Sequence, residues 1–320
     1  MKKVVIFINA MGSDATPDEL DVLYQAKAVE AALHKLGYDT ERVFLGLNLE
    51  KAAERLRQLK PQFVFNLVES VDRSGKLIHL APTLLEHLGI PYTGVRSEAM
   101  YVSSNKTLTK LMLSEARLPT PQWIEDLKTA KLKKNACYIA KPVWEDASVG
   151  ISDSSVMQGD KKLFRAFMEE NSKYRYFFEE YIEGREFNIS ILGGKKGPEV
   201  LPIAEIVFRD YPVGKPRIVG YEAKWHEDSF EYGNTVRSFG LEKEDPGLAK
   251  ALEKICKQCW SLFGLTGYAR VDFRVDEKGR PYILEVNANP CLSPDAGFYA
   301  ASEQAGYDFT SIVERICEDI

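Results

Sequence analysis

The sequence predicts an α/β domain with an open parallel sheet, followed by a longer α+β region whose strands pair antiparallel. In residues 1 to about 100, short apolar runs rich in β-branched residues alternate with helical patterns. Further on, strands follow one another through hairpin-type turns, without that regular alternation. With 320 residues, of which 45% are hydrophobic, the chain is long enough for two or three packed domains.

The amino-terminal part reads as strand, helix, strand. Residues 4–8 are apolar on both faces, as a buried parallel strand requires. The other elements expected here are a helix at 20–36, a strand at 40–44, a helix at 49–59, a strand at 63–68 and a helix at 77–88. No Gly-x-Gly-x-x-Gly follows the first strand, which argues against a nicotinamide-dependent oxidoreductase.

The pattern changes near Tyr101, where we place a domain boundary. The elements expected next are a helix after Asn105 that runs to about 117, a strand at 138–142, a loop at 143–150, a helix at 161–171 and a strand at 174–181. Strands at 187–192 and 200–207 then open the antiparallel remainder. The predicted domains are therefore residues 1–100, on the substrate side, a central domain at 101–182, and a carboxy-terminal domain at 183–320.

Composition narrows the class of protein. Lys and Arg number 42 against 47 Asp and Glu, and no basic run stands out, so nucleic acid is not an expected partner. No apolar run reaches the roughly 20 residues that span a bilayer, and no cleavage site follows the first strand, so a cytoplasmic protein is expected. Of the five cysteines, Cys256 and Cys259 have metal-ligand spacing but lie in an apolar helical pattern, which favours buried thiols.

Residues 269–290 carry the strongest chemical signal. Two alternating strands flank a polar turn, and a pairing symmetric about residues 278 and 279 places Asp272 opposite Glu285 and Arg270 opposite Asn287. Opposed carboxylates repel unless a cation lies between them, and two acids with an amide oxygen suit Mg²⁺. A solvated acidic hairpin is the alternative, and a bulge at Gly279 would shift this register.

Several short motifs occur together and in order. They are 89–94 (Gly-Ile-Pro-Tyr-Thr-Gly), Asn105-Lys106, Lys141-Pro142 with Ser148-Val149-Gly150, Glu179 to Phe187, Glu222-Ala223-Lys224, Arg270-Val271-Asp272 and Glu285 to Pro290. In this combination the chain resembles the ATP-grasp superfamily, and within it the D-alanine-D-alanine ligase group. The resemblance implies an ATP-grasp fold, with a Rossmann-like amino-terminal domain, a small central lid domain and an antiparallel carboxy-terminal domain.

The resemblance also implies roles for residues at the motif positions. ATP would bind to Lys106, Lys141, Ser148, Glu179, Ile182 and Glu186. Metal would bind to Asp272, Glu285 and Asn287, the trio that the hairpin pattern selects, as two Mg²⁺ ions or with Mn²⁺ instead. The catalytic residues would be Arg270, Lys224 and Glu19.

The implied reaction activates a carboxylate with ATP as an acylphosphate, which an amine then attacks, with release of ADP and phosphate. The partners are then a small carboxylate and a small amine, such as an amino acid or a peptide-like molecule. Two alternatives stay open: an authentic D-alanine-D-alanine ligase of cell-wall synthesis, and a non-catalytic ATP-binding regulatory protein. A homodimer is common among relatives, but nothing in the sequence locates an interface.

The substrate side departs from the family pattern. The loop at 66–76 lacks the usual His-Gly and Gly-Glu-Asp-Gly type segment, and Trp225 stands where a tyrosine is usual. Glu69, Asp72 and Arg73 are candidates for recognising a different substrate or are plain surface residues. Cys291 is expected to be a packing residue. These departures leave the identity and chirality of both substrates open.

Overall fold

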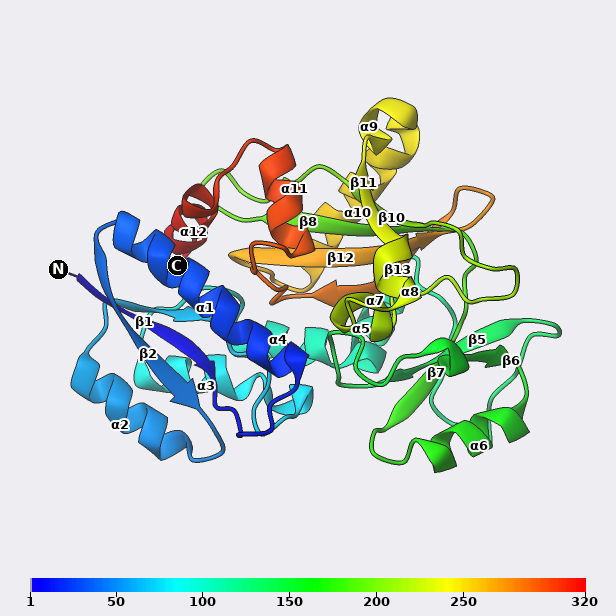
Figure 1. Ribbon diagram of the computed structural model, residues 1–320, viewed down its shortest axis with the longest axis horizontal. Coiled ribbons are helices and arrows are strands. Elements are labelled where there is room, and N and C mark those ends of the chain that lie inside the picture. The colour runs from blue at the N-terminus through cyan, green and yellow to red at the C-terminus, as the bar shows by residue number, and fades with distance from the viewer. Residues whose placement is uncertain (1) are drawn as a thin grey trace.

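Three sheets form the frame of the computed structural model, which describes residues 2–320 (Figure 1). The first is parallel, with three strands in the order β2-β1-β3: β1 Lys2–Asn9, β2 Tyr38–Leu45 and β3 Phe63–Asn66. Its helices are α1 Pro17–Lys35, α2 Leu49–Leu59 and α3 Leu80–Leu88, the last preceded by the short 3-10 helix η1 Gly75–Leu77. The predicted open parallel domain is thus confirmed.

Strand β1 lies at the centre of this sheet and is buried on both faces. Val4, Ile6 and Ile8 belong to one hydrophobic cluster, and Val5 and Phe7 to another on the opposite face. This is why the run carries no polar alternation. Strand β3 is shorter than predicted, because the chain turns after Asn66, whose side-chain oxygen accepts a hydrogen bond from the Val68 amide.

The second sheet is small and antiparallel, in the order β4-β7-β5-β6. Its strands are β4 Trp123–Ile124, β5 Cys137–Pro142, β6 Val156–Gln158 and β7 Tyr176–Glu180, covered by α6 Lys161–Glu170, and the 3-10 helix η2 Asp153–Ser155 precedes β6. An aromatic core joins helix to sheet: the rings of Phe164 and Phe178 stack at 4.1 Å. We call this unit the lid.

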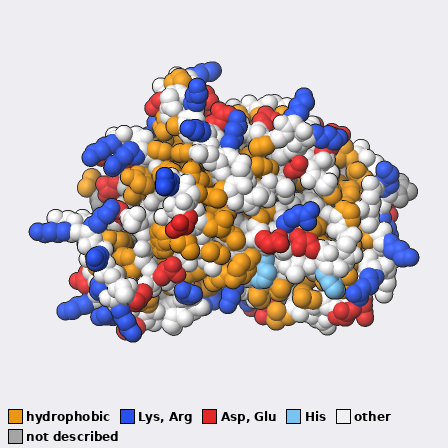
Figure 2. All heavy atoms as spheres, turned by 180° about the vertical axis from the view of Figure 1, so that it is seen from behind, with side chains coloured by type: hydrophobic (Ala, Val, Ile, Leu, Met, Phe, Trp, Pro, Cys, Tyr) orange, Lys and Arg blue, Asp and Glu red, His pale blue; other side chains and the backbone are white. Residues whose placement is uncertain are grey.

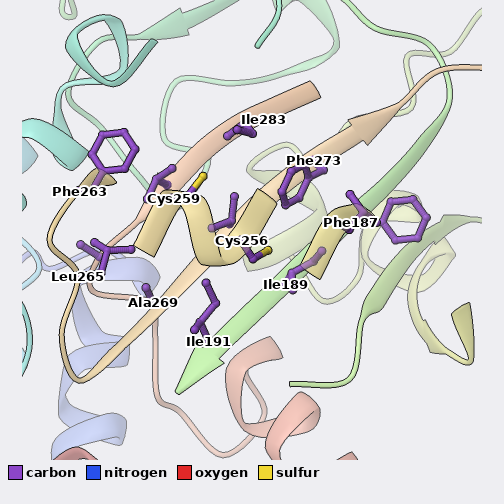
Figure 3. Close-up of a cluster of buried hydrophobic side chains, with 14 of the residues drawn as sticks. Phe187, Ile189, Ile191, Cys256, Cys259, Phe263, Leu265, Ala269, Phe273 and Ile283 are labelled. Atoms are coloured by element: carbon purple, nitrogen blue, oxygen red, sulfur yellow. The ribbon is translucent and has the colours of Figure 1, made fainter. Parts of the chain in front are cut away.

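The third sheet has six strands, with β11-β10-β8-β12-β13 in order and β9 paired to β8. The strands are β8 Arg185–Leu192, β9 Glu199–Val200, β10 Ala204–Phe208, β11 Thr235–Phe239, β12 Tyr268–Val275 and β13 Pro281–Asn287. Helix α10 Pro246–Leu262 packs on one face, where Cys256 and Cys259 are buried with Ile189, Phe187 and Phe273 (Figure 3). The predicted buried thiols are confirmed.

The remaining helices connect these units. They are α4 Ser97–Ser104, α5 Lys106–Glu115, α7 Glu222–Trp225, α8 Phe230–Asn234, α9 Leu241–Glu244, α11 Gly297–Gln304 and α12 Phe309–Glu318. Helix α12 packs beside α1, so the end of the chain returns to the first domain (Figure 1). The boundary proposed between residues 100 and 101 falls inside α4.

Charges are spread over the surface. On the face seen from behind, acidic and basic side chains occur over both halves, with hydrophobic side chains between them (Figure 2). Within residues 2–320, no helix combines the length and the apolar character that crossing a membrane requires.

Candidate active site

A cleft of about 640 Å³ lies where the lid, the third sheet and the loops of the first domain meet. Every predicted site residue lines it: Glu19, Lys106, Lys141, Ser148, Glu179, Ile182, Glu186, Lys224, Arg270, Asp272, Glu285 and Asn287. Segments far apart in the sequence therefore converge on a single cavity. The roles of the individual residues stay predictions, and their contacts are described below.

The β12–β13 hairpin has the predicted pairing at the site, but for a different reason. Arg270 pairs with Asn287 and Asp272 with Glu285, whereas nearer the turn Phe273 pairs with Ile283, one residue out of that register. A bulge between Asp272 and Phe273 makes the difference, because Leu284 is the extra residue on β13. In the register of the turn alone, Glu285 would point to the core. The bulge returns it to the cleft face.

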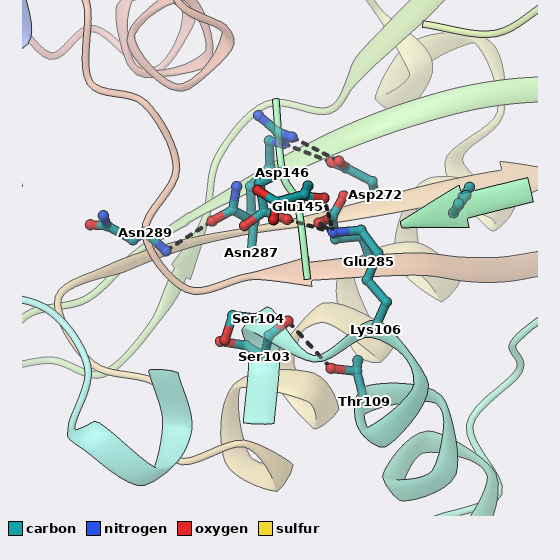
Figure 4. A network of polar contacts seen from close by, with 12 residues as sticks. Ser103, Ser104, Lys106, Thr109, Glu145, Asp146, Asp272, Glu285, Asn287 and Asn289 are labelled. Carbon is teal, nitrogen blue, oxygen red and sulfur yellow. Dashed lines mark hydrogen bonds and ion pairs between the residues drawn. The ribbon is translucent and has the colours of Figure 1, made fainter. Parts of the chain in front are cut away.

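The carboxylates of the hairpin are held by cations (Figure 4). Asp272 accepts two hydrogen bonds from Arg270, at 2.7 Å from Nε and 2.8 Å from Nη2. Glu285 forms an ion pair with Lys106, 2.9 Å between Oε1 and Nζ, and Asn287 accepts a hydrogen bond from the Asn289 amide at 2.9 Å. Two opposed carboxylates and an amide oxygen are a hard donor set that fits Mg²⁺.

Elsewhere in residues 2–320, no cluster of acidic, His or Cys side chains competes with the predicted trio as a metal site. Across residues 2–320, no group of three or more His, Cys, Asp and Glu side chains is arranged to hold a metal ion. The predicted trio contains only two acids, with the amide of Asn287 as its third member. A metal bound there would therefore complete its coordination with water or with oxygens of the nucleotide.

Lys106 forms ion pairs with acidic side chains from two sides of the site, Asp146 and Glu285. It is the first residue of α5, which Asn105 caps, and its Nζ contacts the Glu145 carbonyl oxygen at 2.8 Å and Asp146 Oδ1 at 2.5 Å. Burial disfavours its charge, but Asp146 and Glu285 outweigh burial and raise the pKa of Lys106. Burial and the nearby Glu285 charge raise the pKa of Asp146, against the opposing effect of Lys106.

The lid contributes a buried ion triad. Glu179 of β7 is 1% exposed, and its two oxygens form ion pairs with Lys141 of β5 and Lys110 of α5. Burial alone would raise the pKa of Glu179, but the two lysines together lower it. The role of Glu179 in ATP binding stays a prediction, and its ion pairs tie the lid to α5.

The other predicted nucleotide residues lie around this triad. Ser148 donates a hydrogen bond to the Val219 carbonyl oxygen at 2.7 Å, and Ile182 lines the cleft just after β7. Glu186 of β8 is paired with Arg274 at 2.8 Å, and burial raises its pKa. Glu186 therefore lies on the cleft face of the third sheet beside the lid.

The two remaining predicted catalytic residues lie at different places in the cleft. Lys224 belongs to α7, and burial followed by the charge of Arg270 lowers its pKa. Glu19 lies in the first turn of α1, where it accepts a hydrogen bond from the Thr16 amide at 2.9 Å and pairs with Arg73 at 3.2 Å. Both oxygens of Glu19 are thus engaged by the protein.

An acidic wall closes the end of the cleft beside the first domain. Glu69 accepts a hydrogen bond from Gln25 at 2.7 Å, and Gln25 also donates to Asp21 at 3.1 Å. Asp21 accepts further hydrogen bonds from the Cys291 thiol at 3.0 Å and from Ser293 at 2.7 Å. Cys291 is half-buried and lines the cleft, and its expected role as a packing residue stays a prediction.

The other residues left open by the sequence divide into two groups. Trp225 lines the cleft, and its Nε1 donates to the Ala147 carbonyl oxygen at 3.0 Å. Asp72 and Arg73 adopt left-handed backbone conformations, with φ of 52° and 60°, and are absent from the cleft lining. Arg73 pairs with Asp14 and Glu19 at the surface.

Sequence reasoning missed several cleft contacts. Lys110 lies one helical turn after Lys106, and that spacing was the available signal for a second lysine on the same face. No local sequence pattern marks Asp146 or the hydrogen bond that Tyr221 donates to Asp18 at 2.8 Å. In each contact the two residues are far apart in the sequence.

The chain is similar to a known protein family and to several curated proteins. Residues 115–318 match the family described as the D-ala D-ala ligase C-terminus. The D-alanine-D-alanine ligase of Aquifex aeolicus is 30% identical over 312 residues, which cover 96% of this chain and 97% of that protein. An uncharacterized protein of Sinorhizobium fredii, y4sG, is 27% identical over 304 residues, covering 92% of this chain and 86% of that protein.

Solved structures show the same architecture. The D-alanine-D-alanine ligase of Bacillus anthracis complexed with ATP superposes with a TM-score of 0.76 at 21% identity, covering 100% of this chain and 97% of that one. The VanG D-Ala:D-Ser ligase of Enterococcus faecalis gives a TM-score of 0.71 at 16% identity, covering 100% of this chain and 99% of that one. The predicted three-part architecture is confirmed by these neighbours.

Proposed function

The chain belongs to the D-alanine-D-alanine ligase family of ATP-dependent carboxylate-amine ligases, and from this premise we propose which residues carry the reaction. One observation supports the assignment above the others. The Asp272–Glu285 pair, Arg270 and Lys106 meet in one network between the lid and the third sheet. Such an arrangement of cations and hard oxygen ligands suits phosphoryl transfer from ATP to a carboxylate.

The nucleotide occupies the part of the cleft between the lid and the third sheet. Lys106 and Lys141 neutralise its phosphates, while Glu179, Ile182 and Glu186 contact the nucleoside. Mg²⁺ held by Asp272, Glu285 and Asn287 would supply charge neutralisation at the phosphate oxygens. We propose two ions, which Asp272, Glu285 and Asn287 would hold.

The reaction has two steps. A carboxylate oxygen of the first substrate attacks the γ-phosphorus of ATP, which gives an acylphosphate and ADP. The amine of the second substrate then attacks the acyl carbon, and phosphate leaves. Arg270, already oriented by two hydrogen bonds to Asp272, stabilises the charge that develops on the acyl oxygen, and Lys224 contributes a second cation.

Glu19 is the weakest of the proposed catalytic residues, since the Thr16 amide and Arg73 already occupy its oxygens. We assign it to positioning the start of α1 at the cleft. The domain division, a cytoplasmic location and a homodimer stay predictions.

The experiment is phosphate release from Mg-ATP by the purified protein, with a panel of D- and L-amino acids and larger carboxylic acids, and mass spectrometry of the products. A D-alanyl-D-alanine product would establish the authentic ligase that several relatives are named for. Another acid and amine pair would establish altered specificity. ATP binding without any phosphate release would instead favour a regulatory protein.

The metal site is tested by the double variant Asp272→Asn with Glu285→Gln. We expect the double variant to lose Mg-dependent ATP turnover. ATP should still bind to it in part, and bound ATP should therefore still slow proteolysis of the lid. Glu277→Gln, in the exposed turn of the same hairpin, is the matched control and should leave turnover unchanged. Unchanged turnover in the double variant would contradict the assignment.

A further inference from the structure

Arg274 of β12 is a buried arginine with no part in the proposed phosphoryl transfer. Arg270, Asp272 and Arg274 alternate along β12 and all line the cleft, so their side chains lie on one face of the strand. Arg274 is 3% exposed and lies directly opposite Glu186 of β8. It therefore occupies the end of this row that is nearest to the proposed nucleoside residues.

Three segments of the chain meet at the guanidinium of Arg274. Its Nη2 forms an ion pair with Glu186 Oε2 at 2.8 Å. Nη1 donates a hydrogen bond to the Gly184 carbonyl oxygen at 3.2 Å, and Nη2 donates another to the carbonyl oxygen of Arg217, in the loop after β10. These partners hold the planar group in one orientation, and it fixes the position of the Glu186 carboxylate in turn.

The same guanidinium fixes the segment that joins the lid to the third sheet. This linker lies between β7 and β8, and the centre of the Tyr181 ring within it is 5.6 Å from Arg274 Cζ. Gly184, at its other end, has a φ of 143°, and a Cβ there would overlap the Val275 carbonyl oxygen. The linker is thus held directly against the end of β12, and its residue Ile182 lines the cleft.

The Glu186 carboxylate keeps acceptor capacity for a ligand. Among residues 2–320, Arg274 is its one ion-pair partner, and no other side chain or amide donates a hydrogen bond to it. An ionised carboxylate has about four acceptor sites and donates no hydrogen bond, so it suits ligand hydroxyls. In the nucleoside part of the cleft, the two hydroxyls of a ribose match this requirement.

On the basis of the proposed function, we propose that Arg274 is the positioning residue of the nucleoside site, which holds Glu186 and the lid linker so that the carboxylate accepts hydrogen bonds from the ribose hydroxyls. Arg274 acts through Glu186 and does not itself contact the nucleotide. Discrimination against nucleotides that lack a ribose hydroxyl follows, because such a nucleotide leaves an acceptor of the buried carboxylate without a partner.

The test is calorimetric titration of the full-length protein with the Mg²⁺ complexes of ATP, 2′-deoxy-ATP, 3′-deoxy-ATP and inorganic tripolyphosphate. The wild type should bind ATP about 10- to 100-fold more tightly than the weaker of the two deoxynucleotides, as expected for a hydrogen bond to a charged acceptor. Arg274→Met should bring this ratio close to one and leave the affinity for tripolyphosphate unchanged. Arg274→Lys, which keeps the charge, should retain part of the ratio.

A double-variant cycle tests whether Arg274 acts through Glu186. Glu186→Gln should lose the same discrimination, and adding Arg274→Met to it should cause no further loss. Arg280→Met is the matched control, because Arg280 is an exposed residue of the same hairpin that pairs with Asp276 and does not line the cleft. This control should keep the wild-type ratio.

Equal weakening of ATP, both deoxynucleotides and tripolyphosphate in Arg274→Met would show a purely structural arginine and overturn the inference. Full discrimination in Glu186→Gln would overturn it even if Arg274→Met failed to fold. Equal wild-type affinity for ATP and both deoxynucleotides would overturn it while leaving the proposed ligase function intact. Absence of ATP binding by the wild type would overturn both.

Discussion

The backbone of Gly75, at the start of η1, lies directly against the carbonyl oxygen of Trp144 in the lid. A Cβ at position 75 would come far closer to that oxygen than side chains tolerate, and the Gly75 amide also approaches Glu145 Oε2 at 3.4 Å. The first domain and the lid loop therefore meet at a contact that has room only for glycine.

We expect Gly75→Ala to hold the lid loop away from the first domain. Turnover should fall by about fivefold or more and KM for ATP should rise, because the loop that follows Lys141 no longer closes on the cleft. Steady-state kinetics and thermal melting check this. Gly46→Ala, where an added Cβ meets only Ala10 at 3.6 Å, is the control. Normal kinetics in Gly75→Ala would show that closure does not need this contact.

Glu179→Gln is expected to destabilise the protein as well as weaken nucleotide binding. Removing the charge leaves Lys110 and Lys141 as two neighbouring cations, one of them fully buried. Loss of one partner from a buried ion cluster costs about 3–5 kcal/mol of unfolding free energy. Glu180→Gln is the matched control, since Glu180 pairs with Lys133, which is largely exposed, and should cost less than about 1 kcal/mol. Urea denaturation distinguishes the two variants, and equal losses would contradict the prediction.

Stability should fall as pH rises through the titration of Glu69. Burial raises the pKa of this carboxyl to about 8 from an ordinary 4.5, with Asp21 adding to the effect and Gln25 opposing it. Between these values the folded protein binds more protons than the unfolded chain, so its unfolding free energy decreases with increasing pH.

Glu69→Gln removes this titration. At pH 8 the variant should gain about 1–3 kcal/mol relative to the wild type, and less at pH 5. Denaturation curves at several pH values provide the measurement, with Glu54→Gln, an exposed residue of α2, as the control. If the unfolding free energy of Glu69→Gln changed with pH as steeply as that of the wild type, other groups would be responsible for the pH dependence.

Cys256 and Cys259 should resist alkylation in the native protein. Burial raises the pKa of Cys259 to about 12 and that of Cys256 well above its usual range, so neither thiol forms the reactive thiolate at neutral pH. Peptide mapping after iodoacetamide treatment, with and without denaturant, checks the prediction. Rapid native labelling of either residue would show that α10 opens readily.

Much of the fold followed from local patterns. The uninterrupted apolar run of β1 predicted a central parallel strand, and the alternation in β12 and β13 predicted a hairpin with Asp272 opposite Glu285. The bulge at Leu284 was beyond such reasoning, because nothing in a strand sequence marks which residue is left unpaired. The register at the site was right because this bulge compensates for pairing near the turn that is one residue out of the predicted register.

The contacts that close the cleft were not predictable in the same way. Asp146 carries charge but no local pattern, and Lys110 is marked only by its spacing from Lys106; the ion pairs of both residues depend on how the lid approaches α5. A charged residue in a sequence is most often a solvated one. Only the tertiary structure shows that these two charges are paired inside the protein.

Lys106 of α5 joins Asp146, in the loop of the lid, to Glu285 of the third sheet. When the lid opens, Asp146 must move away from Lys106, so the protein breaks one of its own ion pairs before any molecule can leave the cleft. Departure of the product, with opening of the lid, rather than bond formation, would then limit the rate of each catalytic cycle.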